Sequence, residues 1–416
     1  MHPPAREPRW WRLGAFALLL LGVAVRGGAW LLDPVLPFED GTLLFARSYA
    51  EPRLSDWFAP YAGYVPVGSN VAAWCACRLP TAAIPHAFVG LAMLLHTAAA
   101  CSVLHPGWQL LGRFRLRLLL AAVVAWVPWS SVLVPTTLSY VQWSMLWWLV
   151  VVLLRPCGGT RMARLRHGLA VAMLVLWHPL ALTLAPLLAL PAVRRGRAAV
   201  LLGFVAALVG YWVLRQMVVT EVPAVQAERL ALVPTTWLGR VMLEAFAGYE
   251  LRPWLLAQLG TWSVSAAGLL LAMGWLALVL RARRRWSEPV QAFAVGVVWV
   301  GVVALAVAAM RRDQFDPDGD GSVRYFALGR LGLQTLAILA LGTLASWRWA
   351  AGLGALVLVV PWLDGIARQA VPAGGAAAMR SFVTELQAQE LRRGGRRWIR
   401  ARLVQDNGWV ILIRPR

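Results

Sequence analysis

The sequence has 416 residues, of which 60% are hydrophobic and only 14% are charged. This composition excludes an ordinary soluble globular domain and indicates a polytopic membrane protein. The formal net charge of +21 comes from 40 basic residues, all of them arginine, against 19 acids. These arginines lie mostly between hydrophobic segments, which favours cytoplasmic loops and anionic lipid headgroups over nucleic acid as partners.

The N-terminal residues 1–12 are rich in arginine, and an apolar segment follows over 13–25. Its length suits the hydrophobic region of a signal peptide. The apolar run resumes over 27–32, however, and no small-residue cleavage site follows. We therefore interpret it as an uncleaved signal anchor with residues 1–12 in the cytoplasm. Both interpretations place the next residues, 33–83, outside the cytoplasm.

Two adjacent carboxylates, Glu39 and Asp40, follow this first hydrophobic segment. Acids at the outer mouth of a membrane helix are candidates for binding a cation or abstracting a proton. The alternative is that the pair only solvates a loop. Farther along the same loop, Tyr61 and Tyr64 flank an Ala-Gly pair, and this composition predicts an ordered surface. A loop packed against the top of the bundle is the alternative there.

Further apolar segments have about the length that a bilayer requires. They lie at 84–104, 116–135, 138–154, 198–217, 262–280, 290–309, 325–345 and 349–366. The stretch 168–193 is too short for two crossings and contains Trp177-His178-Pro179, which predicts a broken helix or a half-membrane hairpin. The sequence thus predicts an all-α polytopic transmembrane bundle of about nine to eleven spans over residues 13–366.

The positions of the arginines support this threading. Arginine clusters precede the first span and follow several others, and all fall on one side if 168–193 enters and leaves by the same face. The positive-inside rule makes that side the cytoplasm. The opposite side then holds most of the acids, in the outer loops 33–83, 218–261 and 310–324.

The C-terminal tail, 367–416, is predicted to be extracytoplasmic by the number of spans. Its arginines between 392 and 402 would suit the cytoplasm, but a long tail is only loosely bound by the charge rule. The tail is expected to form a short amphipathic helix over 381–391 and a strand over 410–413.

Three aspartates, Asp316, Asp318 and Asp320, match the first half of an EF-hand calcium loop. The twelfth position should be glutamate but is Ala327, so a full calcium loop is not expected. The alternatives are a looser site for a divalent cation at the membrane surface and a solvated turn.

Three further sites carry polar groups at the ends or breaks of spans. Arg324, with Tyr325, opens a late span and is suited to hold a phosphate, or else extends to lipid headgroups. Gln142, beside Trp143, is placed to hydrogen-bond a sugar hydroxyl or to join two helices. His178 is expected to be a packed neutral histidine, with proton handling as the alternative. No nucleotide-binding, G-x-S-x-G or H-E-x-x-H motif is present.

Taken together, these motifs resemble the uncharacterised bacterial integral membrane proteins of the polytopic glycosyltransferase (GT-C) type. The matching residues are Phe38-Glu39-Asp40-Gly41, Phe45-Ala46, Pro60-Tyr61-Ala62-Gly63-Tyr64, Gln142-Trp143, Arg324-Tyr325 and Gly408-Trp409. The sequence departs from the family pattern at Val65-Pro66-Val67, which leaves the donor and acceptor specificity open.

The resemblance implies transfer of a sugar from a polyprenyl-phosphate donor to a glycan or other cell-envelope acceptor outside the plasma (inner) membrane. It implies a first-loop carboxylate, Asp40 or Glu39, as the general base. Arg324, with Arg311 or Arg312, would offset the charge of the leaving phosphate. The three aspartates of 316–320 would add Mg²⁺ or Mn²⁺ if the reaction needs a metal.

Two other functions remain in view from the sequence. One is a non-catalytic transporter or flippase of lipid-linked glycans, and the other is a structural membrane protein of the cell envelope. A transporter is expected to carry matching broken helices in both halves and buried charges in mid-span. The break at 177–179 has no evident counterpart in the sequence, which favours the enzyme.

Overall fold

The computed structural model describes the chain as a helical protein. It covers residues 7–37, 40–49, 53–60, 65–126, 133–156, 160–194, 198–216, 232–248, 251–310, 323–366, 375–391, 399–402 and 410–413. Within these residues there is one two-stranded sheet, and all other regular elements are helices. This confirms the predicted helical class.

The elements are labelled α for α-helices, η for 3₁₀- or π-helices and β for strands. In chain order they are α1 (Arg9–Arg26), α2 (Gly28–Leu32), η1 (Asp40–Phe45), α3 (Ala46–Tyr49), η2 (Leu54–Phe58), α4 (Val67–Ala76), η3 (Thr81–Ala83), α5 (Ile84–Cys101), η4 (Ser102–Leu104), η5 (Pro106–Leu111), α6 (Phe114–Trp126), α7 (Leu133–Thr136), α8 (Gln142–Leu154), α9 (Arg161–Val175), η6 (Pro179–Ala189), α10 (Pro191–Arg194), α11 (Ala198–Gln216), α13 (Val233–Thr236), η7 (Trp237–Leu243), α14 (Glu244–Ala247), α15 (Leu251–Leu259), α16 (Thr261–Arg283), α17 (Glu288–Met310), α18 (Val323–Leu344), α19 (Trp347–Ile366), α20 (Gly375–Leu391), β1 (Ile399–Arg402) and β2 (Val410–Ile413).

Four helical segments are long and apolar enough to cross a membrane: Thr81–Leu104, Thr261–Arg283, Glu288–Ala309 and Phe326–Leu344. They differ in how much of their surface the protein covers. Only 17% of the apolar window in α16 is buried, against 72% in α18. A helix that is apolar and uncovered has its side chains available to lipid, whereas α18 belongs to the centre of the bundle.

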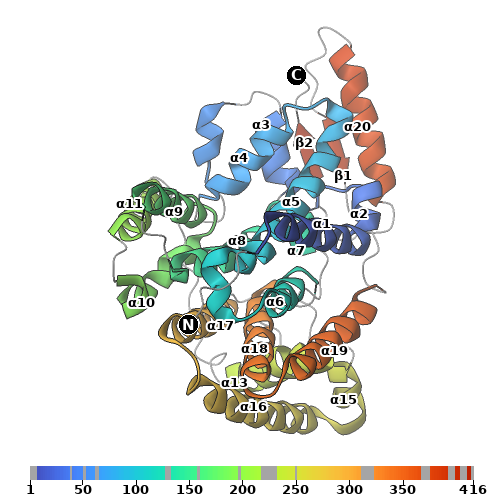
Figure 1. Cartoon of the computed structure of the whole chain (residues 1–416). Helices are drawn as coiled ribbons and strands as arrows, with labels where there is room; N and C mark the ends of the chain where they lie inside the picture. Colours follow the sequence, from blue (N-terminus) through green and yellow to red (C-terminus); the bar gives the residue numbers. More distant parts are fainter. Residues whose placement is uncertain are drawn as a thin grey trace.

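Helix α8 forms the middle of the bundle (Figure 1). All of its residues except Trp148 are buried, and it packs against α5, α9 and α17. Because the helix is apolar on every side, it is stable only when surrounded by other helices. Trp147 of α8 and Trp108 of η5 both pack on the ring of Phe293 in α17.

The helix is interrupted between α9 and η6, at the Trp177-His178-Pro179 sequence that predicted a broken helix. We call this interruption the chain break. His178 has an extended backbone, and its Nδ1 accepts a hydrogen bond from the backbone N–H of Leu180 at 2.9 Å. The side chain therefore caps η6, whose first residue is a proline with no N–H to donate.

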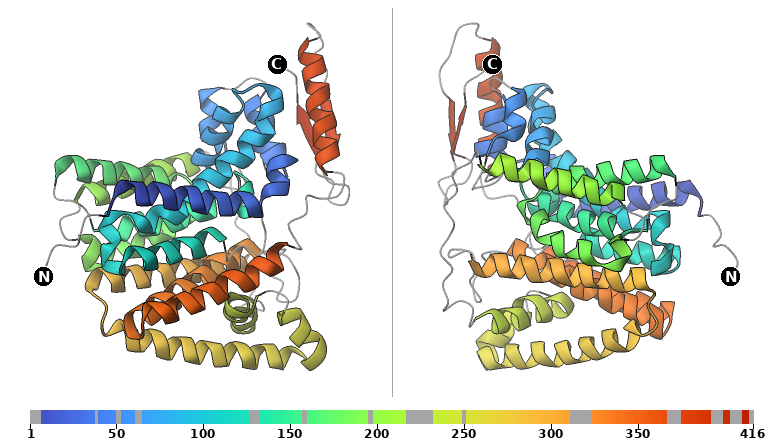
Figure 2. Two further views of the ribbon diagram at one scale, coloured as in Figure 1. Left: turned by 45° about the vertical axis from the view of Figure 1, so that its right-hand side comes forward. Right: turned by 90° about the vertical axis from the view of Figure 1, so that its left-hand side faces the viewer.

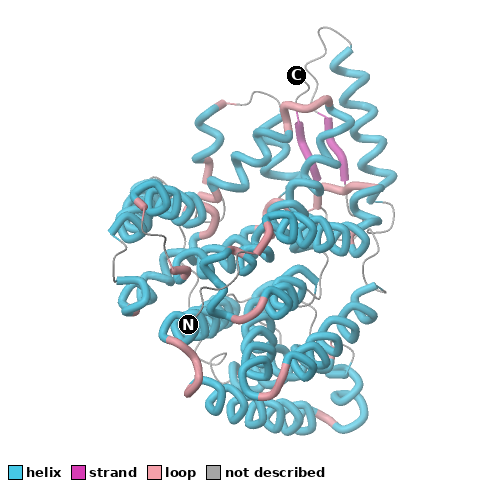
Figure 3. The backbone as a smooth tube through the Cα atoms, viewed as in Figure 1, coloured by secondary structure: helices cyan, strands magenta, loops and turns pink. Residues whose placement is uncertain are grey.

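The bundle has two distinct ends. Figure 2 shows the N-terminus at one end and α20 with the strands at the other, with α1, α16 and α19 running across between them. Strands β1 and β2 pair antiparallel, with Ile399 opposite Ile413, beside α20 (Figure 3). The strand expected over 410–413 is therefore present.

Helix α20 covers the first loop. Phe382 packs on Phe45 with ring centroids 6.0 Å apart, and Arg380 forms an ion pair with Asp33. Phe382 and Leu386 belong to a hydrophobic cluster with Tyr49 and other residues of η1, α3, α4 and α5. The tail helix and the first loop therefore lie at the same end of the bundle.

Candidate functional site

Asp40 is the first residue of η1, and its side chain is buried, with 1% of its surface exposed. Its Oδ2 accepts a hydrogen bond from the backbone N–H of Leu138 at 2.8 Å, and its Oδ1 accepts one from Ser139 at 2.8 Å. Two charge-assisted bonds to backbone donors compensate the burial of a carboxylate. Asp40 thus fixes the start of η1 to the turn that precedes α8.

The same turn is held from α4. The hydroxyl of Ser69 donates to the carbonyl of Leu138 at 2.9 Å, so both polar groups of that residue are bound by the first loop. The side-chain amide of Asn70 donates to the carbonyls of Trp57 and Ala59, at 3.2 and 3.0 Å. The described part of the first loop is therefore an ordered layer fastened to the bundle.

Three more of the residues singled out in the sequence lie beside this turn. Gln142 begins α8 and is buried, and the ring of Trp143 lies 4.7 Å from the ring of His178. A Cβ on Gly68 of α4 would lie 2.1 Å from the indole of Trp177, so α4 approaches the chain break closely. We call this group the first-loop cluster; it comprises Asp40, Ser69, Ser139, Gln142, Trp143 and His178.

The side chains of the other predicted site residues lie outside the described part of the structure. Arg324 and Tyr325 lie in the first turn of α18, and only their backbone is described. The rest lie outside the described residues: Glu39, Tyr61, Tyr64, Arg311, Arg312, Asp316, Asp318 and Asp320. No group of three or more potential metal ligands occurs among the residues that the structure does describe. The metal site at 316–320 therefore remains a prediction.

A second polar site was not predicted from the sequence. Glu244 of α14 binds the Nε of Arg252 through Oε1 at 2.7 Å, and its Oε2 pairs with Arg330 of α18. The Nε of Arg330 also donates to the carbonyl of Arg240 in η7 at 2.7 Å. All four residues are buried, with 3% or less of their surface exposed. We call them the buried arginine cluster.

This cluster is costly to build. Removal of an ion from water costs several kcal/mol even in a real protein, and only close pairing returns that energy. Glu244 supplies such pairing, because its two oxygens bind Arg252 and Arg330. The guanidinium of Arg240 additionally lies over the ring of Phe326, 4.8 Å from its centroid. Close pairing and the contact with an aromatic ring therefore compensate part of the cost of burying these charges.

An apolar groove has a volume of about 220 Å³ and is lined in part by residues adjacent in sequence to members of the cluster. It runs between η7, α16, α17 and α18, and its lining includes Val241 and Gly329, the neighbours of Arg240 and Arg330. The remaining lining residues are Trp237, Trp275, Val297, Val298, Gly301, Val302, Leu305, Gly332 and Leu333. The apolar lining of the groove suits a hydrocarbon chain.

The sequence did contain a signal for this site. Arg330 stands inside the apolar segment 325–345, which was predicted to be a span. Ionisable residues inside membrane segments mark functional sites by default. Arg240, Glu244 and Arg252 lie in the predicted outer loop 218–261, however, so the cluster was not visible from local pattern.

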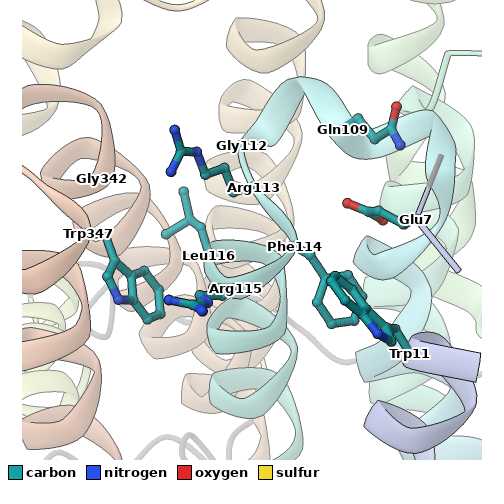
Figure 4. Close-up of a pocket in the computed structure, with 10 residues that line it drawn as sticks. All are labelled: Glu7, Trp11, Gln109, Gly112, Arg113, Phe114, Arg115, Leu116, Gly342 and Trp347. Atoms are coloured by element: carbon teal, nitrogen blue, oxygen red, sulfur yellow. The ribbon is translucent and has the colours of Figure 1, made fainter. Parts of the chain in front are cut away.

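Two further cavities lie at the end of the bundle that carries Arg9, Arg12, Arg113, Arg115 and Arg155, which we call the arginine-rich end. The larger, with a volume of about 960 Å³, is lined by Arg113 and Arg115 near Trp347 on one side and by Glu7 near Gln109 on the other (Figure 4). Between the cavities, the buried Arg117 pairs with Glu7 and donates to the carbonyls of Leu104 and His105, at 3.1 and 3.3 Å.

The smaller cavity at this end has a volume of about 550 Å³. Asp40 lines none of these three spaces: the two cavities and the apolar groove.

No protein-family model, curated protein or solved structure matches the chain.

Proposed function

We propose that the chain is a multi-pass protein of the plasma (inner) membrane that transfers a sugar from a polyprenyl-phosphate donor to a cell-envelope acceptor outside the cytoplasm. The motifs at 38–41, 60–64, 142–143 and 324–325 support this assignment, as do four helices suited to a bilayer. The observation that carries the proposal is the buried arginine cluster beside an apolar groove.

A polyprenyl-phosphate sugar has two parts that need different surroundings. Its phosphate suits guanidinium groups, which bind two oxygens at once, and its first isoprene units suit an apolar groove. Arg324 stands six residues before Arg330 on α18, which is about 9 Å along the helix axis at 1.5 Å per residue. Arg324, and Arg311 or Arg312 before it, would extend the same cationic surface and stabilise the leaving phosphate.

The hydrogen bonds of Asp40 support different roles for the two first-loop acids. Both oxygens of Asp40 accept backbone hydrogen bonds inside the protein, so we assign Asp40 to positioning the first loop on α8. Its chain neighbour Glu39 is then the proposed general base, because a sugar hydroxyl needs a carboxylate to take its proton during attack. Gln142, Trp143 and His178 adjoin the turn that Asp40 holds and are proposed to contact the acceptor.

The test uses membranes supplied with a radiolabelled polyprenyl-phosphate sugar. Glu39→Gln is expected to lower transfer by about 10²-fold or more, the usual contribution of a general base, without loss of thermal stability. Asp40→Asn is expected to lower transfer and stability together. Asp33→Asn is the matched control, because Asp33 is a carboxylate of the same loop that is half exposed at the surface. Unchanged transfer by both Glu39→Gln and Asp40→Asn would exclude a first-loop base.

One observation favours a second candidate, a flippase of lipid-linked glycans. Buried charges in the interior of a bundle are typical of transporters, and Arg240, Glu244, Arg252 and Arg330 are such charges. Proteoliposomes with a fluorescent lipid-linked oligosaccharide and no acceptor separate the two functions. Movement of the label across the bilayer without any transfer would favour the flippase over the enzyme.

A further inference from the structure

The smaller cavity at the arginine-rich end has two kinds of wall. Arg9 and Arg12 in the first turns of α1 and Arg155, directly after α8, supply three guanidinium groups to its lining. The apolar part of the lining comes from the adjoining turns of α1, α5, η4 and α8, and consists of Leu13, Phe16, Ala98, Cys101, Leu104 and Trp148.

The charge of this cavity is one-sided. None of the described residues that line it is acidic. Glu7, the acid near it, is paired with the buried Arg117. The Nε of Arg12 is buried and has no hydrogen-bond partner among the described residues. A buried polar atom without a partner costs free energy that a bound anion would recover.

His105 also lines the cavity, and the positive charges around it affect its pKa. Partial burial of its ring and, to a smaller extent, repulsion by the charges of Arg155, Arg12, His167 and Arg117 together lower its pKa to about 4. The imidazole is therefore neutral at physiological pH, and the arginines alone set the charge of the cavity.

The cationic and apolar walls of the cavity lie at different depths along the helices. Trp148 stands two helical turns before Arg155 on α8, about 10 Å along the axis at 1.5 Å per residue. Phe16 stands one turn beyond Arg12 on α1. The cations therefore lie at the helix ends and the apolar walls one or two turns deeper. A free phosphate would use only the first of these, whereas a phospholipid uses both.

We propose that this cavity binds an anionic phospholipid, with its phosphate between Arg9, Arg12 and Arg155 and its acyl chains along Phe16, Leu104 and Trp148. The charge rule assigns this end of the bundle to the cytoplasmic leaflet. The site is thus separate from the proposed donor site at the buried arginine cluster. It does not depend on the proposed sugar transfer.

The full-length protein in neutral detergent is titrated with phosphatidylglycerol, with phosphatidylcholine and with inorganic phosphate, and its thermal unfolding is followed. Phosphatidylglycerol is expected to raise the melting temperature, and the other two are not. Arg12→Gln/Arg155→Gln is expected to weaken the apparent lipid affinity at least tenfold. Arg113→Gln/Arg115→Gln is the matched control, because it removes two arginines from the other cavity at the same end.

A second variant tests the cavity without changing its charge. Ala98→Phe fills the apolar wall and is expected to lower the lipid affinity while all arginines remain. The proposal is overturned if both variants respond to phosphatidylglycerol like the unmodified chain, or if the control pair loses as much affinity as Arg12→Gln/Arg155→Gln. An equal response to inorganic phosphate would overturn the assignment to a lipid.

Discussion

The carboxylate of Asp40 accepts a hydrogen bond at 2.8 Å from the backbone N–H of Ser139, a residue 99 positions later in the chain. Together with the bond from Leu138, it joins the first loop to the start of the central helix α8. Asp40, which the sequence singles out as a candidate general base, therefore joins two segments that are far apart in the chain. The first-loop cluster depends on this bond for its arrangement.

Replacement of Asp40 tests how much the bond contributes to folding. Asp40→Ala leaves two buried backbone donors unsatisfied, at about 1–3 kcal/mol for each group. Asp40→Asn keeps one acceptor but turns an amide N–H₂ toward the other donor, so an intermediate loss is expected. Thermal unfolding in detergent measures the series. Asp33→Asn should cost about 1 kcal/mol or less, because its pair with Arg380 is exposed; equal losses at positions 33 and 40 would contradict a buried role for Asp40.

Glu244→Gln is expected to destabilise the protein by about 3–5 kcal/mol, because it leaves the buried Arg252 and Arg330 without their carboxylate. Replacement of Glu244, Arg252 and Arg330 by methionine removes these three charges together, leaves Arg240 in place, and should restore most of the stability. Sugar transfer separates the two roles of the cluster. We expect the methionine triple variant to fold and to be inactive, and full activity in that variant would show that the cluster is only structural.

Gly68→Ala tests the close approach of α4 to the chain break. The added methyl would lie 2.1 Å from the indole of Trp177, so the ring or the helix must move, at about 1–3 kcal/mol for an overpacked site. Gly90→Ala in α5 is the matched control, since nothing lies within 4 Å of the position of its Cβ. That change should stabilise the helix by up to about 1 kcal/mol. Melting temperatures that move in the same direction for both variants would contradict the predicted contact.

His105 makes stability depend on pH in a defined window. Its pKa is about 4 in the folded protein and 6.5 in the reference state, so the unfolded chain binds more protons between these values. The contribution of His105 is therefore complete above about pH 6.5 and is lost as the pH falls toward 4. His105→Gln should flatten the dependence of the melting temperature on pH over this window. An identical pH profile in the variant would exclude the shift.

Local patterns in the sequence predicted the local features of the fold. The helical class, the chain break at 177–179 and the strand at 410–413 each follow from hydrophobic runs, a proline or a short β-branched run. The apolar segment 138–154 was expected to be one span. In the structure its first residues form a turn, and α8 begins at Gln142, because Asp40 holds the amides of Leu138 and Ser139.

The contacts that build the sites were beyond sequence reasoning because they join distant segments. Glu244 meets Arg330 across 86 residues, and no periodicity in either helix names the partner. Arg12, Ala98 and Arg155 similarly come from three separate elements that only the packing of α1, α5 and α8 brings together. Sequence pattern identified candidate residue types, and tertiary packing decided which of them meet.

The position of α20 means that the first loop is synthesised long before its packing can be completed. Arg380 and Asp33, which pair at the end of the bundle, are separated by 347 residues, so the ribosome makes the first loop long before the helix that covers it. Until residues 379–386 have been synthesised, Phe45 and its neighbours lack the cover that Met379, Phe382 and Leu386 provide. The loop that is made first is therefore completed last, and a chain shortened at its C-terminus would lose the cover of its first loop.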